Sequence, residues 1–253
     1  MIRVHFILHG RLAVLANRHG ESLSYDTEIT LLSSLFDAVQ AQGIAHVAVS
    51  RLSLNGAEAE WNDHLQNGDH VEVYPFLPSK GETPLDSPAL PAPPAFLLDV
   101  HLGRLAAYMR LLGFDTAYHS SDIGDSQLVQ QAVTEKRILL TCDRHLLMHR
   151  ALQWGYLLQS RISKQQMFEI LEFFDIRKDT KPFTRCMACN GLLRETSVGE
   201  IREQAPPLVR LRNGLSPENY STCSVCGKLY WPGTHSARME RLLIQWGLDS
   251  RKE

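Results

Sequence analysis

The first eighty residues carry the hydrophobic pattern of a small unit built from strands and one helix. Four hydrophobic residues alternate with other residues at the start of the chain: Ile2, Val4, Phe6 and Leu8. A period of two is typical of a strand with one buried face. Residues 30–42 have helical spacing that ends near Gly43, and two further strands flank Asn-Gly turns before the last strand at residues 71–74. We expect an α+β domain over residues 1–77.

Residues 78–95 interrupt this pattern. Six of these eighteen residues are proline, which lacks a backbone N–H and favours an extended, semi-rigid chain. We interpret the segment as a linker. It should be the first site of limited proteolysis, and residues 95–253 should fold without the N-terminal domain.

Strands and helices alternate in residues 96–182. Short apolar strands are predicted at residues 96–98, 116–119, 137–141 and 156–158, and helices at residues 102–112, 126–135, from about 144, and at 163–174, where Ser163 is the expected N-cap. Apolar strands separated by helices are typical of a parallel sheet that is covered on both faces. The sequence therefore predicts an α/β domain in this region.

Acidic residues follow three of the predicted strands. Asp99 follows the first, Asp122 and Asp125 lie in the loop after the second, and Asp143 follows the third. The carboxyl ends of parallel strands meet at one edge of the sheet. Clustered carboxylates repel one another unless a cation lies among them, and Mg²⁺ and Mn²⁺ prefer such oxygen ligands.

A metal held in this way can activate water and stabilise the charge of a phosphate under attack. The pattern therefore predicts metal-dependent hydrolysis of phosphodiester bonds, with Asp99, Asp125 and Asp143 as catalytic residues. Asp122 joins these three as a ligand of magnesium or manganese. Two other interpretations stay open: Asp99 and Asp143 could be helix N-caps, and Asp122 could belong to an ordinary turn.

The cysteines predict a second metal site in residues 183–253. Four of the five cysteines form two C-x-x-C pairs, Cys186 with Cys189 and Cys223 with Cys226, and Cys142 stands alone. Paired C-x-x-C elements with a glycine close behind suit zinc held by four thiolates. Because four protein ligands leave no open position, such a zinc is structural. A redox-active dithiol is the alternative.

Residues 96 to 231 resemble the Mut-seven C-terminal ribonuclease domain family. Asp99, the helix start Leu102-Gly103-Arg104-Leu105, the acidic loop and the run Thr141-Cys142-Asp143-Arg144 carry the resemblance. The resemblance implies a PIN-like nuclease domain followed by a zinc ribbon. The sequence departs from the family pattern in two places: Cys142 replaces a basic residue, and the acidic loop lacks an acid near residues 126–127.

The N-terminal domain resembles a ubiquitin-like β-grasp domain of the sulfur-carrier type. Such carriers end in a free Gly-Gly, whereas here the last strand continues into Pro75-Phe76. Carrier chemistry is therefore not expected. We expect the domain to provide structural support or to bind a protein partner.

Charge is distributed unevenly, which bears on the partner. Residues 1–80 contain 5 Lys/Arg and 9 Asp/Glu, whereas residues 183–253 contain 10 and 7. Basic and aromatic residues of the last segment suit phosphate contacts and base stacking: Arg194, Arg202, Arg210, Arg212, Lys228, Tyr230, Trp231, His235 and Arg238. In the α/β domain, Arg104, Arg144 and Thr141 are candidate RNA contacts, and Arg110 is either another or a solvated helix residue. Thr141 could also hydrogen-bond a metal-bound water or a carboxylate, or only complete its strand.

These patterns together predict a cytoplasmic, metal-dependent ribonuclease with a zinc ribbon that assists RNA binding. No apolar run is long enough to span a membrane. Endonucleolytic cleavage of RNA, with tRNA or another structured RNA as candidate substrates, is the expected activity. The alternative is a non-catalytic RNA-binding or adaptor protein that uses its β-grasp domain to bind partners.

Overall fold

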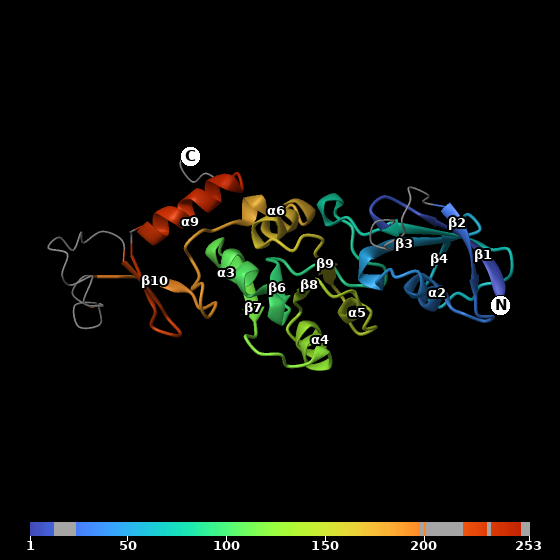
Figure 1. The fold of residues 1–253 in the computed structure, drawn as a ribbon, viewed down its shortest axis with the longest axis horizontal. Coiled ribbons are helices and arrows are strands. Elements are labelled where there is room, and N and C mark those ends of the chain that lie inside the picture. The colour runs from blue at the N-terminus through green and yellow to red at the C-terminus, as the bar shows by residue number, and fades with distance from the viewer. Residues whose placement is uncertain (13–23, 198–199, 201–219, 232–233, 249–253) are drawn as a thin grey trace.

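The chain forms three consecutive units along one long axis (Figure 1). The computed structural model describes residues 1–12, 24–197, 200, 220–231 and 234–248. A β-grasp domain lies at one end, the α/β domain lies in the middle, and the cysteine-bearing ribbon lies at the other end. Among the described residues, no helix has both the length and the apolar character needed to cross a bilayer.

The N-terminal unit is a five-stranded sheet with one helix. Its elements are β1 (Ile2–Leu8), β2 (Ser24–Ile29), α2 (Leu35–Ala41), the 3-10 turn η1 (His46–Ala48), β3 (Val49–Leu54), β4 (Ala57–Ala59) and β5 (His70–Pro75). The strand order is β2-β1-β5-β3-β4, and β1 pairs with β5 in parallel. The helix begins five residues later than predicted because Ser34 caps it and accepts a hydrogen bond from the Asp37 N–H. The β-grasp prediction is confirmed.

The middle unit is a parallel sheet, as predicted. Its strands β6 (Ala95–Leu98), β7 (Asp115–Tyr118), β8 (Ile138–Thr141) and β9 (Gly155–Leu157) lie in the order β7-β6-β8-β9. The helices are η3 (Val100–Leu102), α3 (Gly103–Leu111), α4 (Asp125–Thr134), α5 (Arg144–Leu147) and α6 (Ser163–Phe173), followed by η4 (Arg177–Asp179). Ser163 is the first helical residue and not the N-cap, which is Ile162.

The C-terminal unit adds a helix that the sequence analysis did not predict. The strands β10 (Leu193–Thr196), β11 (Tyr220–Cys223) and β12 (Leu229–Tyr230) form an antiparallel sheet, and α9 (Thr234–Gln245) follows. Figure 1 shows α9 beside α3 and α6. The indole of Trp246 packs 5.2 Å from the Tyr108 ring and donates to the Lys164 carbonyl at 3.1 Å. The last helix is therefore part of the α/β domain's hydrophobic core.

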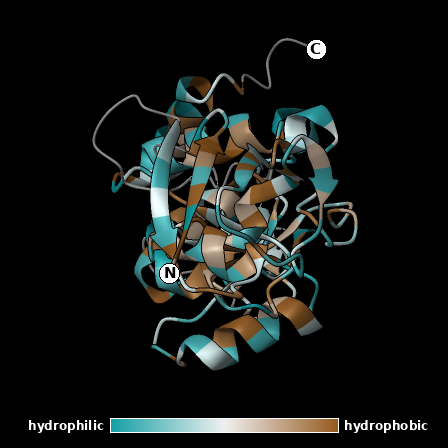
Figure 2. Cartoon of the chain, turned by 90° about the vertical axis from the view of Figure 1, so that its right-hand side faces the viewer, coloured by the Kyte–Doolittle hydropathy of each residue, from teal (hydrophilic) through white to brown (hydrophobic). Residues whose placement is uncertain are grey.

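Both faces of the parallel sheet are buried. Phe96 and Leu98 face a core that contains α3, α6 and α9, whereas Leu97 and Leu139 face α4 and α5. The strands in Figure 2 carry both hydrophilic and hydrophobic bands, most clearly in the half-buried strands of the β-grasp sheet. Successive residues of a strand are all buried only where both faces of the sheet are covered, as in β8.

The second of these cores includes residues of the β-grasp domain. Ala45 and Val47, in and just before η1, belong to the cluster that contains Leu97, Leu139 and Leu147 of the α/β domain. The two domains therefore share hydrophobic contacts.

The proline-rich segment is attached to both of its neighbours. The Leu85 N–H donates to Val49 of β3 at 2.8 Å, the Ser87 hydroxyl donates to the Gln153 carbonyl at 2.9 Å, and the Trp154 indole donates to the Pro88 carbonyl at 2.9 Å. The separate folding of residues 95–253 stays a prediction, but these contacts imply that separation costs stability.

Deleting residues 1–80 should therefore lower the stability of the α/β domain. Exposing the surface that Val47 covers costs about 2 kcal/mol or more, since that is the typical value of one buried valine. Urea denaturation of residues 95–253 and of the full chain, followed by near-ultraviolet circular dichroism, gives the comparison. Equal midpoints for the two proteins would show that the β-grasp domain adds nothing to the α/β domain's stability.

Candidate active site and zinc centre

The strand-end aspartates lie at one edge of the parallel sheet. Asp99 follows β6 and Asp143 follows β8, and these strands are direct neighbours with Leu98 paired to Leu140. The loop after β7, the neighbour on the other side of β6, carries Asp122 and Asp125. All of these strands are parallel, so the four aspartates emerge from the carboxyl end of the sheet, where open α/β sheets bind their ligands.

A buried threonine connects two of the four aspartates. The Thr141 hydroxyl donates to Asp99 Oδ2 at 2.9 Å and accepts the Asp143 N–H at 2.9 Å. Its side chain is fully buried, so it does not contact RNA as predicted. Its role in the structure is to orient Asp99 and the start of the Asp143 loop.

The N-cap interpretation applies to one aspartate of this pair. Asp143 caps α5 through its Oδ1, which accepts the His145 N–H at 2.8 Å. Asp99 precedes η3 but makes no side-chain cap hydrogen bond. Each carboxylate uses one oxygen in these hydrogen bonds, and within the described part of the chain the other oxygen, Asp99 Oδ1 or Asp143 Oδ2, has no hydrogen-bond partner.

Gly103 allows the first turn of α3 to approach this edge closely. A Cβ at this position would lie 2.7 Å from the hydroxyl of Tyr118, which donates to the Val100 carbonyl at 2.9 Å. A larger residue would require the Tyr118 ring to shift. The packing at the start of α3 therefore explains the run Leu102-Gly103-Arg104-Leu105. Its two leucines are buried, and Arg104 is exposed.

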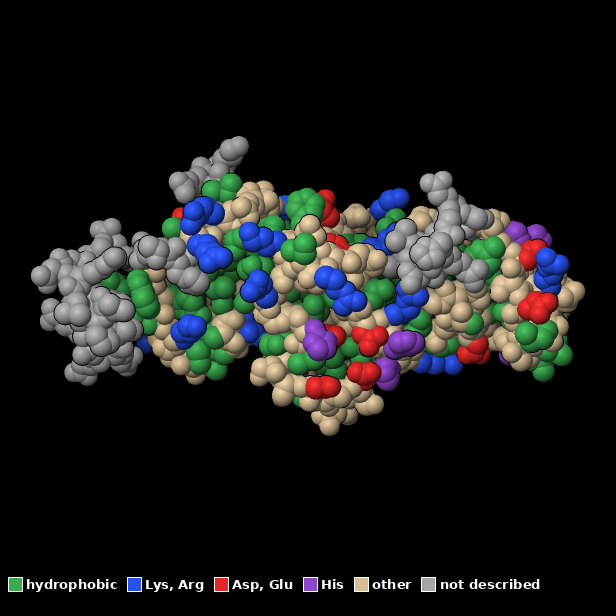
Figure 3. Space-filling view, in the orientation of Figure 1, with side chains coloured by type: hydrophobic (Ala, Val, Ile, Leu, Met, Phe, Trp, Pro, Cys, Tyr) green, Lys and Arg blue, Asp and Glu red, His purple; other side chains and the backbone are tan. Residues whose placement is uncertain are grey.

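Asp122 and Asp125 lie farther out at the same edge. Asp122 Oδ1 accepts the Gly124 N–H at 2.8 Å, as in a turn, and Asp125 is the exposed first residue of α4. Among the described residues, the four aspartates do not form a group of three or more potential ligands close enough to hold a metal ion, as the four cysteines do. Figure 3 shows acidic and histidine side chains gathered over the region of α4 and α5. Exposed residues of these loops include Asp122, Asp125, Asp143, His101 and His145.

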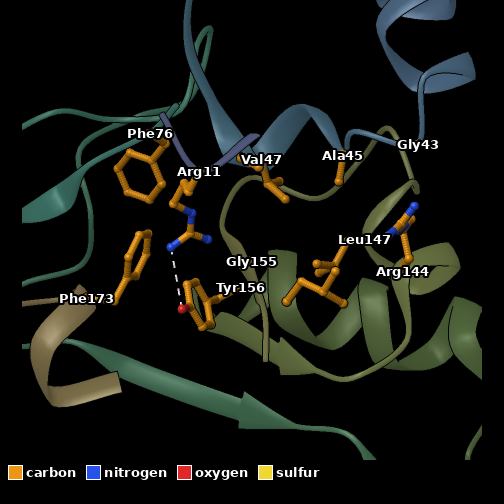
Figure 4. A pocket seen from close by; sticks show the side chains of 12 residues that line it. Arg11, Gly43, Ala45, Val47, Phe76, Arg144, Leu147, Gly155, Tyr156 and Phe173 are labelled. Atoms are coloured by element: carbon orange, nitrogen blue, oxygen red, sulfur yellow. Dashed lines mark hydrogen bonds between the residues drawn. The ribbon is translucent and has the colours of Figure 1, made fainter. Parts of the chain in front are cut away.

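The candidate RNA-binding arginines have different environments. Arg104 is exposed at the carboxyl edge. Arg144 follows Asp143 and lines a pocket between the two domains together with Gly43 and Leu147 (Figure 4), and its contact with RNA stays a prediction. Arg110 is buried and donates to carbonyls of residues 116, 187 and 188, so neither of the two roles considered for it is correct.

Arg161 is a basic residue at this edge that the sequence analysis missed. It is exposed in the loop after β9. Burial raises the pKa of the Cys142 thiol, and the charge of Arg161 opposes that rise while the charge of Asp99 adds to it. Arg161 and Asp99 therefore both lie near Cys142. A raised thiol pKa also argues against Cys142 as a nucleophile.

The loop that carries Arg161 is held firmly. The Glu169 carboxylate accepts the N–H groups of Gln159 and Ser160, and the buried Gln166 amide donates to the Ser160 carbonyl at 2.8 Å. Among the described residues, no ion pair or hydrogen bond is recorded for the Arg161 guanidinium. An ordered loop with an unpaired guanidinium next to a carboxylate edge suits the recognition of a phosphate.

The four paired cysteines meet at one point. Their sulfur atoms all lie within 4.8 Å of one another, with Cys186 Sγ 3.7 Å from Cys226 Sγ and Cys189 Sγ 3.4 Å from Cys223 Sγ. Four thiolates around a tetrahedral zinc at about 2.3 Å lie about 3.8 Å apart. None of the cysteines forms a disulfide. The cluster therefore fits a four-thiolate zinc site.

The thiols affect one another's ionisation. Burial would raise the pKa of Cys186, but hydrogen bonds from the Tyr230 hydroxyl and from backbone N–H groups of the knuckle lower it to about 6. Burial and the neighbouring thiols raise the pKa of Cys189 to about 12. Four thiols this close cannot all ionise without a cation. A bound zinc ion would stabilise all four as thiolates.

Neighbouring residues complete this centre. A Cβ at Gly191 would lie 2.8 Å from Cys223 Sγ, so only glycine fits there. The Tyr230 hydroxyl lies 3.1 Å from Cys186 Sγ and accepts the Met187 N–H, which attaches this side chain to the knuckle. Of the other ribbon residues considered for RNA, Trp231 is partly exposed and Arg194 pairs with Glu200 at 3.0 Å. Arg202, Arg210 and Arg212, and the side chain of His235, lie outside the described residues.

A buried polar network joins the first knuckle to the amino end of β7. Arg110 donates to the carbonyls of Met187 and Ala188 at 3.2 and 2.9 Å, and Asn190 both accepts the Thr116 N–H and donates to Asp115. Burial would raise the pKa of Asp115, but hydrogen bonds from Arg137 and Asn190 and the nearby guanidinium charges hold it below its ordinary value. The knuckle therefore packs at the edge of the sheet opposite to the aspartates.

A PIN-like parallel sheet with strand-end carboxylates, joined to a four-cysteine ribbon, defines a nuclease-type α/β protein. Comparison with family models agrees, since residues 94–243 match the Mut7-C RNAse domain and residues 1–80 match the Mut7-C ubiquitin domain. The chain belongs to the Mut7-C RNase domain family.

The solved structures similar to the chain each cover less than a third of it. A putative molybdopterin converting factor, subunit 1, from Pyrococcus furiosus is 19% identical, covers 30% of this chain and 98% of its own, and has a TM-score of 0.25. The H. volcanii small archaeal modifier protein 1 is 17% identical over 30% of this chain and 98% of its own, with a TM-score of 0.25. No curated protein matches the chain.

Purified protein should contain about one zinc ion per chain. Cys186→Ser should lower the zinc content and lower the thermal midpoint by about 5 °C or more, because metal binding is coupled to folding and about 2 kcal/mol corresponds to such a shift at this size. Metal analysis and thermal melting provide the two measurements. Cys142→Ser is the matched control and should keep its zinc. A folded, zinc-free wild-type protein would disprove the assignment.

Proposed function

We propose that the protein is a divalent-metal-dependent ribonuclease that cleaves RNA internally. The observation that carries this proposal is the Asp99–Thr141–Asp143 arrangement at the carboxyl edge of the sheet. A magnesium ion in proteins is commonly held by one or two carboxylates, with water and substrate phosphate oxygens in its other positions. Asp99 and Asp143 supply two carboxylates, and membership of an RNase domain family favours RNA as the substrate.

The chain's own residues would divide the work as follows. Asp99 and Asp143 would hold the metal, which would supply water activation and stabilisation of the charge on the phosphate. Thr141 fixes the orientation of Asp99 through its buried hydroxyl. Asp122 and Asp125 would extend the acidic edge, and their role as metal ligands stays a prediction.

Two exposed arginines would hold the RNA backbone. Arg104 lies on the first turn of α3 and Arg161 in the loop after β9, so they flank the edge from opposite sides of β6 and β8. Guanidinium groups form bidentate hydrogen bonds with phosphate. The ribbon packs at the other end of β7, roughly 10 Å away for a four-residue strand. Its contribution to RNA binding would therefore be to a more distant part of the substrate.

Asp99→Asn and Asp143→Asn should each reduce the cleavage rate by about a hundredfold or more, because each removes charge that holds the metal. Thermal midpoints without metal should stay the same or rise, since asparagine can still accept the Thr141 and His145 hydrogen bonds and repulsion is relieved. Cleavage of total RNA with Mn²⁺ and thermal melting give the comparison. Asp125→Asn tests the third ligand in the same assay.

Variants of the connecting threonine sharpen this test. Thr141→Val should reduce cleavage about ten- to a hundredfold, as loss of a residue that orients a metal ligand does. Thr141→Ser keeps the hydroxyl and should remain active, and Asp179→Asn, at an exposed position in η4, should behave as the wild type. Undiminished cleavage by both Asp99→Asn and Asp143→Asn would show that these aspartates do not hold a catalytic metal. RNA binding without cleavage by the wild-type protein would favour the non-catalytic alternative.

Arg161→Ala should weaken RNA binding without changing the chemical step. We expect KM to rise about tenfold with kcat nearly unchanged. The slope of log affinity against log salt concentration should decrease by about one, which corresponds to the loss of one phosphate contact. Steady-state kinetics at several salt concentrations measure both effects. Lys178→Ala serves as the control, because Lys178 is an exposed cation in η4 and not in the loops that form this edge. The same salt dependence in Arg161→Ala and wild type would exclude the contact.

A further inference from the structure

The segment between Asp143 and β9 lies between the sheet and the β-grasp domain. It consists of α5, which has only four residues, and the connection to Gly155. One helical turn is not stable on its own, since helix nucleation is costly. The position of α5, and with it the position of its N-cap Asp143, must therefore come from tertiary contacts.

The hydrophobic part of these contacts comes from both domains. Leu146 and Leu147 of α5 are buried in the cluster that contains Leu97 and Leu139 of the sheet and Ala45 and Val47 of the β-grasp domain. Figure 4 shows Val47 and Ala45 facing Leu147 across the domain boundary.

Close packing of β9 against η1 completes this part of the interface. A Cβ at Gly155 would lie 3.3 Å from Val47, and nearer still to Leu147. The absence of a side chain at Gly155 lets these groups meet. Val47 is fully buried there.

Hydrogen bonds hold the same segment from the β-grasp side. The Gln40 amide donates to the carbonyl of Met148, the C-cap of α5, at 3.0 Å. His46 Nε2 lies 2.8 Å from the Leu152 carbonyl, and Arg150 donates to Asn62 at 3.1 Å. Three points along residues 148–152 are thus fixed by the other domain.

A second contact fixes the angle between the domains. The Arg11 guanidinium lies 4.8 Å from the Tyr156 ring centroid and 4.2 Å from that of Phe173 (Figure 4). Phe76, at the end of the β-grasp domain where a carrier would have its free tail, is buried edge-on against Phe173 at 5.9 Å. The β-grasp domain therefore contacts both β9 and α6 and has a defined position.

We propose that the β-grasp domain is a positioning element of the nuclease site: by holding residues 144–155 it fixes Asp143 relative to Asp99. This inference rests on the proposed function for its effect on metal binding. The β-grasp domain contacts residues 144–155 of the same chain. It therefore acts as an internal support and not as a carrier.

The test uses full-length Val47→Ala and, as a milder change, Gln40→Ala. Hydrogen–deuterium exchange of peptides over residues 143–152 should become several-fold faster in both variants, while peptides of α3 keep their protection. A Mn²⁺ titration well below the melting temperature should show that the variants bind Mn²⁺ about threefold more weakly than the wild type, or weaker still. Residues that hold a metal ligand in place contribute to metal affinity in this way. Val4→Ala is the matched control, since Val4 is equally buried but belongs to the β-grasp domain's own core.

Three other outcomes would each contradict a specific part of the proposal. Unchanged exchange in both variants would show that the interface does not support residues 144–155. Faster exchange with unchanged Mn²⁺ affinity would restrict the domain to a stabilising role and overturn the positioning of Asp143. Wild-type protein that neither binds Mn²⁺ nor cleaves RNA would overturn the proposed function itself, whereas the exchange measurement would still report on the support.

Discussion

The candidate site depends on the parallel pairing of β6 with β8, joined at its end by the hydroxyl of Thr141. Parallel strands in register bring Asp99 and the Asp143 loop side by side. The buried hydroxyl then donates to one and accepts from the other. A threonine satisfies both because a hydroxyl is donor and acceptor at once. In a water-free position these hydrogen bonds are costly to break, so the two acidic loops cannot move independently.

The opposite end of the sheet is fixed by a different kind of interaction. Arg110 is buried, and its guanidinium satisfies carbonyls of β7 and of the first zinc knuckle. Asp115 and Asn190 add hydrogen bonds at the same junction. Buried charges are stable only when they are paired and hydrogen-bonded in this way. The ribbon is therefore built into the α/β domain, and α9 extends this attachment by burying Trp246 in the domain's core.

The β-grasp domain is attached at a third side, where β9 forms the edge of the sheet. Edge strands expose unpaired backbone groups and are usually covered. Here η1 packs beside β9, and Val47 reaches the same core as Leu147. The end of β5 is also buried through Phe76. The N-terminal β-grasp domain thus covers this edge of the α/β domain.

Sequence alone determined the features that depend on local periodicity and spacing: the alternation of strands and helices, the parallel sheet, the strand-end aspartates and the paired cysteines. Tertiary structure decided the roles of Arg110, Tyr230 and Thr141, whose partners are distant in sequence or whose burial a periodic pattern cannot show. It also decided that α9 packs on α6 and that Val47 packs on α5. The pattern of an amphipathic segment predicts which face is buried, but it does not predict the element against which this face packs. That element is determined by contacts between residues that lie about a hundred positions apart in the sequence.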